Sequence, residues 1–197
     1  MSVIKDDSEH LIEFLNNIHP LGKEVIALTK QETFKVFLKK NEVLPCPIKQ
    51  GEDGVFFILE GIVRGFIVDN GRDITTSIME ENYLIGHVRN SYPDKPVYQE
   101  QFQALEDSKL LVVSHSLIDQ LYLQYPDVNI LGRKLLAIHF HMSKEGAILS
   151  RIPSAEARYN QFRKIYPNLK NRVPVKFLAT YLGMRIETLS RIRKKEK

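Results

Sequence analysis

Residues 175–193 read VKFLATYLGMRIETLSRIR, and this stretch decides the organisation of the C-terminal part of the chain. Two short helices that cross closely need a small residue at the crossing and a residue that tolerates positive φ at the turn. Ala179 and Gly183 meet these two needs. The positions that such a pair must bury are apolar: Leu178, Leu182, Met184, Leu189 and Ile192. The stretch predicts a helix-turn-helix, with a purely structural helical hairpin as the alternative.

The second helix of this pair, roughly 185–195, would face the major groove of DNA. Arginine can bind guanine with two hydrogen bonds, glutamate can accept one from cytosine, and Ser or Thr can bond base edges or phosphates. Lys194 and Lys195 come a turn later, where lysines neutralise phosphates. The candidate DNA-binding residues are Arg185, Glu187, Thr188, Ser190, Arg191, Arg193, Lys194 and Lys195.

Positive charge collects at the same end of the chain. Residues 170–197 hold nine Lys and Arg against two Glu, a net charge of about +7, which leaves about −3 on residues 1–169. A basic segment on a mildly acidic body favours a polyanionic partner at one end, and a solvated charge run is the alternative.

A long helix is predicted over 128–152, ended by Pro153. Its apolar residues recur at alternating steps of three and four, interrupted by Glu145, which is the spacing of a coiled-coil seam. The predicted dimer seam is Leu131, Leu135, Ile138, Met142 and Leu149. This spacing predicts a parallel homodimer, although the stripe could instead pack on the rest of the same chain.

The N-terminal half alternates short β-rich runs with turn signals, after a helix expected over 8–18 with Ser8 as its cap. Many short strands at close spacing are typical of a barrel or jelly roll, and Asn70-Gly71 favours a tight hairpin. A short helix is expected from 117 to 125. The predicted strands are 33–38, 55–59, 62–68, 74–79, 102–105 and 110–113.

The composition narrows the class of protein. The chain has 197 residues, of which 43% are hydrophobic, without the apolar run of a signal peptide or membrane span, so we expect a cytoplasmic protein that does not bind membranes. Cys46 is the one cysteine, which excludes an internal disulfide and a cysteine-ligated cluster within one chain. We expect no metal and no cofactor.

Four short segments stand out within this order of elements: 51–61 (GEDGVFFILEG), 83–86 (YLIG), 104–108 (ALEDS) and 187–191 (ETLSR). With them, the chain resembles the family of the cyclic-AMP receptor protein and the fumarate and nitrate reduction regulator, the Crp/Fnr family. The resemblance covers nearly the whole chain. It implies a homodimeric transcription regulator with a jelly-roll effector barrel, a dimerisation helix and a DNA-reading helix, and RNA polymerase as a partner.

The chain also departs from this family. Cyclic-nucleotide-binding members hold the ribose with a Glu after the glycine of Tyr83–Gly86, where this chain has His87, and the phosphate with an Arg, which is absent from 90–108. We therefore expect an effector less anionic than a cyclic nucleotide, or none. Ile186 stands where the cyclic-AMP receptor protein has an arginine, and no length remains for a wing after 197. The candidate effector pocket is Gly86, His87, Tyr98, Gln99 and Gln101.

Three domains are expected: a sensing barrel at 1–126, a dimerisation helix at 127–152 and a helix-turn-helix domain at 153–197. The fold class is α+β, and the partners are double-stranded DNA, a second copy of the chain and a possible small-molecule effector. Two alternatives stay open. One is a ligand-binding module that acts only through protein partners, and the other is a cupin-type metalloenzyme, although His139 and His141 would point to different helix faces.

Overall fold

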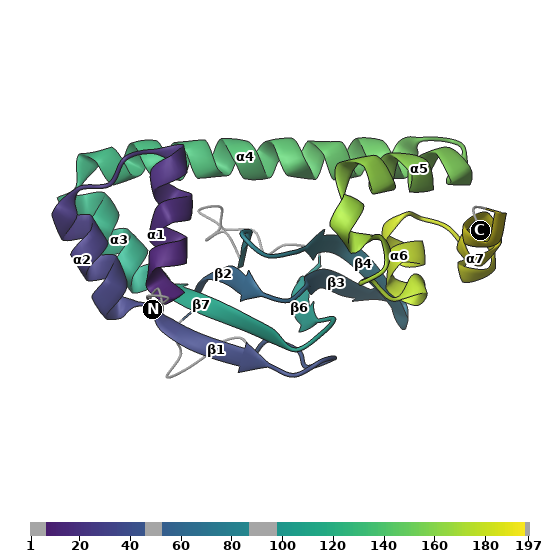
Figure 1. Cartoon of the computed structure of the whole chain (residues 1–197), viewed down its shortest axis with the longest axis horizontal. Coiled ribbons are helices and arrows are strands. Elements are labelled where there is room, and N and C mark those ends of the chain that lie inside the picture. Colours follow the sequence, from purple (N-terminus) through teal and green to yellow (C-terminus); the bar gives the residue numbers. More distant parts are fainter. Residues whose placement is uncertain (1–6, 46–52, 87–97, 196–197) are drawn as a thin grey trace, which may run out of the picture.

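The strands form two antiparallel sheets within the residues that the computed structural model describes, 7–45, 53–86 and 98–195. Apolar side chains such as Phe56, Ile58, Val63, Phe102 and Leu110 form one buried core from strands of both sheets, which confirms the predicted jelly-roll barrel (Figure 1). The strands of the first sheet lie in the order β1 (Phe34–Leu38), β7 (Ser108–Ser114), β2 (Gly54–Glu60) and β5 (Leu84–Gly86). The strands of the second sheet lie in the order β4 (Arg72–Met79), β3 (Val63–Asp69) and β6 (Gln101–Ala104). The six predicted strands are present, and β5 was not predicted as a strand.

The hairpin between β3 and β4 forms where the sequence predicts it. Asp69 pairs with Arg72, so Asn70 and Gly71 are the two turn residues. Their φ angles are 48° and 76°, the left-handed conformation that this kind of turn requires. The turn sets the register at the start of β4, the strand against which α6 packs.

Three helices gather at one end of the barrel, and a long fourth helix runs from them along the molecule (Figure 1). They are α1 (Asp7–Ile18), α2 (Lys23–Glu32), α3 (His115–Gln124) and α4 (Pro126–Arg151). Ser8 lies inside α1 and is buried, so it is not the expected cap, whereas Ser114 caps α3 by accepting from the Leu117 amide. The sequence did not predict α2. No helix in the described parts of the chain is long and apolar enough to cross a bilayer.

The C-terminal helices dock onto the barrel rather than standing apart from it. Ser154 caps the first of them, because its hydroxyl accepts a hydrogen bond from the Ala157 amide. Leu178 of the helix-turn-helix shares one buried core with Ile62, Ile78 and Leu105 of the barrel. The segment consists of α5 (Ala155–Ile165), the 3₁₀ turn η1 (Pro167–Lys170), α6 (Val175–Tyr181) and α7 (Ile186–Lys195).

The predicted dimer seam on α4 needs correction. Leu131 and Leu149 are only 4% and 3% exposed within one chain, and Leu135 packs against the α1 core, so these residues are not available to a partner helix. Ile138 and Met142 remain at least partly exposed. The heptad pattern shows only how the apolar residues are spaced. This spacing is the same whether the stripe packs against a second copy of the chain or against α1 and the C-terminal helices.

An ion cluster joins the C-terminal helices to the turns of the barrel. The Arg172 guanidinium donates to both carboxylate oxygens of Glu81, at 2.5 and 3.0 Å, and also to Glu106. The hydrogen bond from Arg172 lowers the pKa of Glu81 to about 2. Ion pairing therefore supports the docking, in addition to the shared apolar core.

We predict that Glu81→Gln weakens the fold at neutral pH by about 1 kcal/mol, since the pair is partly exposed to water. Glu81 has a lowered pKa, so its contribution is present above the ordinary pKa of about 4.5 and is lost as the pH falls towards 2. Urea unfolding from pH 7 to pH 3 should show a flatter pH dependence in the variant. Glu24→Gln, at an exposed carboxylate on α2, serves as the control. Equal pH dependence in Glu81→Gln and wild type would contradict the assignment.

Candidate nucleic-acid interface and ligand pocket

The helix-turn-helix has the geometry that its sequence predicts. Ala179 is fully buried where α6 meets α7, and Gly183 has a φ of 61° in the turn. The turn is closed by hydrogen bonds from the Gly183 amide to the Thr180 carbonyl and from the Met184 amide to the Ala179 carbonyl. Of the five predicted apolar positions, Met184 is half-buried. The other four are buried: Leu178, Leu182, Leu189 and Ile192. The motif is therefore a packed pair with one free face on α7.

That free face carries charged side chains. Arg185, Glu187, Arg191, Lys194 and Lys195 are exposed, as a helix that contacts DNA requires. Thr188 and Ser190 are half-buried, and Ile186 is 46% exposed at the first turn. Helix α7 lies at the end of the molecule opposite to α1 and α2, so no described part of the barrel covers it (Figure 1).

Arg193 differs from the other candidate DNA-binding residues. It is half-buried, and its guanidinium donates to the Lys170 carbonyl at 2.7 Å and lies 5.7 Å from the centroid of the Tyr159 ring. This hydrogen bond fastens α7 to η1, and the assignment of Arg193 to the DNA-binding set stays a prediction. The sequence shows that position 193 is basic and lies on a basic helix. It does not show that this side chain meets the Lys170 carbonyl, 23 residues earlier in the chain.

Arg158 is a structural anchor that the sequence analysis missed. Its guanidinium donates to the Ile152 carbonyl at 2.5 Å, at the break between α4 and α5, and to the Gly183 carbonyl at 3.3 Å. One side chain thus ties the end of the long helix to the turn of the helix-turn-helix. Nothing in the spacing of charged residues on α5 signals this role.

The candidate effector pocket is only partly assembled. Gln99 and Gln101 line a concavity of about 210 Å³, together with apolar residues such as Leu44, Phe56 and Phe102. Gly86 ends β5, and Tyr98 is half-exposed with its hydroxyl 3.4 Å from Asp69; neither lines this concavity. His87 lies outside the described residues.

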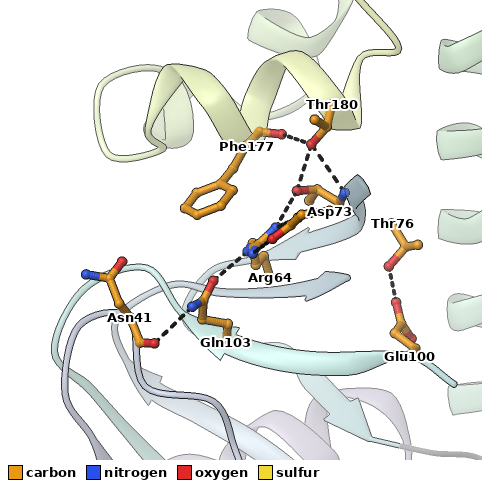
Figure 2. A network of polar contacts seen from close by, with 9 residues as sticks. Asn41, Arg64, Asp73, Thr76, Glu100, Gln103, Phe177 and Thr180 are labelled. Atoms are coloured by element: carbon orange, nitrogen blue, oxygen red, sulfur yellow. Dashed lines mark hydrogen bonds and ion pairs between the residues drawn. The ribbon is translucent and has the colours of Figure 1, made fainter. Parts of the chain in front are cut away.

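A carboxylate occupies the part of the barrel next to the predicted pocket. Glu100, which also lines the concavity, accepts a hydrogen bond from the Thr76 hydroxyl (Figure 2) and a longer one of 3.4 Å from Ser77. Glu100 also lies close above Gly65, where a Cβ would require the Glu100 carboxylate and the Ser77 hydroxyl to shift. The sequence shows that this stretch lacks an arginine, but no pattern in it singles out Glu100. The pocket therefore presents an anion to any ligand.

No group of three or more His, Cys, Asp or Glu that could hold a metal occurs among the described residues. His139 and His141 lie on α4 and differ in exposure, the first half-buried and the second exposed. Cys46 and His87 fall outside the described ranges. The described part of the barrel thus offers hydroxyls, amides and carboxylates, which suit hydrogen bonding to a ligand.

Comparison with known proteins agrees with this arrangement. Residues 35–125 match the family model described as the cyclic nucleotide-binding domain, and no curated protein matches the chain. FixK2 from Bradyrhizobium japonicum is 20% identical with a TM-score of 0.65, covering 83% of each chain. A putative Crp/Fnr-family regulator from Eubacterium rectale is 14% identical with a TM-score of 0.64, covering 91% of this chain and 87% of that one.

A third solved structure extends the similarity along the chain. A cyclic nucleotide-binding domain containing protein from Listeria monocytogenes is 14% identical with a TM-score of 0.65, covering 96% of this chain and 90% of that one. At these identities the comparisons show the fold. The resemblance to Crp/Fnr regulators stated from the sequence is confirmed at that level.

We predict that cyclic AMP and cyclic GMP produce no saturable heat in titration calorimetry at millimolar ligand. The Glu100 carboxylate repels a cyclic phosphate, and the chain has no arginine from 90 to 108 to bind one. Titration of buffer alone provides the baseline. Saturable binding of either nucleotide at micromolar concentration would contradict this account of the pocket.

Proposed function

We propose that this chain, which has the fold of Crp/Fnr regulators, is a homodimeric DNA-binding transcription regulator whose barrel does not respond to cyclic nucleotides. The observation that carries the proposal is the helix-turn-helix, in which the constrained positions are filled and α7 keeps a basic exposed face. A purely structural hairpin has no need of three exposed Lys and Arg on one short helix, with an exposed arginine, Arg185, directly before it. The proposed role is recognition rather than catalysis, in the cytoplasm, with RNA polymerase as a further partner by resemblance.

The exposed face of α4 supports the homodimer. Leu136 and Phe140 are 55% and 72% exposed and lie on the side of the helix opposite to the buried Leu131 and Leu149. The positions 136, 140, 143, 147 and 150 follow the steps of four and three that a coiled-coil seam requires. The last three are Ser143, Ala147 and Ser150, small residues that let two helices approach closely. We place the seam here instead of on the stripe that packs inside the chain.

A ligand of the barrel would meet a mixed surface. The concavity beside Gln99 and Gln101 combines apolar walls with the carboxylates of Asp53 and Glu100. Neutral or cationic hydrogen-bond donors fit this chemistry better than anions. The proposed effector, if the barrel takes one, is therefore a small neutral or cationic molecule.

Arg191→Ala is expected to cost roughly 1–3 kcal/mol on the cognate duplex and to relax discrimination at one base pair per half-site, because Arg191 can hold guanine with two hydrogen bonds. Lys195→Ala should weaken binding to every sequence about equally and reduce the slope of log K against log salt by about one unit. Fluorescence anisotropy over a salt series separates the two effects. An unchanged sequence preference in Arg191→Ala would refute the assignment of α7 as the reading helix.

We also expect Phe140→Glu to convert the dimer to a monomer at tens of micromolar, since a buried seam position cannot hold two facing carboxylates without a large penalty. Sedimentation velocity measures the change. Phe37→Glu is the matched control, because Phe37 is 68% exposed on the edge strand β1, which lies on the opposite side of the molecule from α4 (Figure 1). A dimer that persists in Phe140→Glu, or a monomeric wild type, would rule out this seam.

A further inference from the structure

An arginine is fully enclosed between the barrel and the helix-turn-helix. Arg64 lies in β3, and its side chain is only 2% exposed. Its guanidinium makes a two-point ion pair with Asp73 of β4, at 2.5 and 2.6 Å (Figure 2). It also donates to the Thr75 hydroxyl at 3.0 Å. Burial of a guanidinium is costly, so these bonds are needed to hold it there.

Helix α6 covers the Arg64 guanidinium. The ring of Phe177 lies 3.7 Å from the Arg64 guanidinium carbon, a cation–π contact made with the face of the ring. The Thr180 hydroxyl accepts from the Thr75 amide at 3.2 Å and lies 3.0 Å from the Thr75 hydroxyl. Arg64 thus joins the barrel to the first helix of the motif, and any movement of α6 away from β4 would expose it.

The same arginine contacts the strand that lines the ligand concavity. Its Nε donates to the Gln103 side chain at 2.8 Å, and Gln103 donates in turn to the Asn41 carbonyl at 2.9 Å. Gln103 and Gln101 are on β6, two residues apart, and Gln101 lines the concavity. A displacement of β6 would therefore shift the Arg64 side chain, because a direct hydrogen bond joins Arg64 to Gln103.

We propose that Arg64 is a positioning residue for DNA binding: it fixes α6, and through α6 the recognition helix α7, relative to the barrel and α4. The inference rests on the proposed function. The docked position leaves the charged face of α7 exposed, so docking prepares the helix for DNA rather than covering it. A dimer that binds two half-sites at fixed spacing gains affinity from such rigidity, because the second contact is then made within one complex.

The first test compares Arg64→Met with wild type on two duplexes, one with both selected half-sites and one with a single half-site. We expect the dissociation constant for the full site to rise by roughly tenfold, with a change of less than about twofold for the single half-site. Arg72→Met, at an exposed position of β4, is the matched control and should behave as wild type. An equal loss of affinity for both duplexes would indicate damage to the helix-turn-helix itself. Tighter binding of the full site would indicate that docking inhibits DNA binding. Either result overturns the proposal.

The second test does not depend on DNA. Arg151 is exposed at the end of α4, so trypsin can cut there when the C-terminal helices swing away from the barrel. Release of the fragment after 151 should be faster in Arg64→Met than in wild type or Arg72→Met, at unchanged far-ultraviolet circular dichroism. Thr180→Val should also speed the release of this fragment, but by less, since it removes only the hydrogen bonds of the Thr180 hydroxyl.

The two tests separate the two claims. Equal trypsin rates in all variants would overturn the role of Arg64 even if the protein binds DNA. Faster cleavage in Arg64→Met, together with a wild type that binds no duplex, would overturn the proposed function and with it the positioning role. Faster cleavage with a selective loss on the full site supports both.

Discussion

The packing of α6 against β4 is the contact on which the rest of the structure depends. It encloses the Arg64 guanidinium between Asp73 and Phe177, and it merges the apolar core of the C-terminal helices with residues of the barrel. A charged group held out of water needs all of its partners at once, so the docked geometry is sharply defined. The orientation of α7 is therefore set by the barrel as well as by the long helix that leads to it.

Local features of the sequence predicted local structure well. The helix-turn-helix follows from Ala179 and Gly183, whose small size and backbone freedom are needed within one short segment. The β3–β4 hairpin follows from Asn70-Gly71 for the same reason. The strands followed from short β-rich runs and the turn residues between them, but β5 has only three residues, too few to form such a run.

Partners distant in the sequence could not be predicted. The stripe that contains Leu131 and Leu149 has the period of a dimer seam, yet these two residues are buried within the chain itself. Spacing alone does not distinguish a seam from such internal packing. Arg193 bonds a backbone carbonyl in η1, and Glu100 is held by hydroxyls of β4. The residue types at these positions were visible, but their contacts arise only when separate segments fold together.

The central claim is that a dimer presents two α7 helices to DNA. Selection of bound duplexes from a random pool by the full chain, followed by sequencing, tests it most directly. The account predicts enrichment of an inverted repeat whose half-site centres lie about 10 base pairs apart, one turn of the double helix. Recovery of duplexes with no shared sequence, or of a single half-site without its inverted copy, would contradict it.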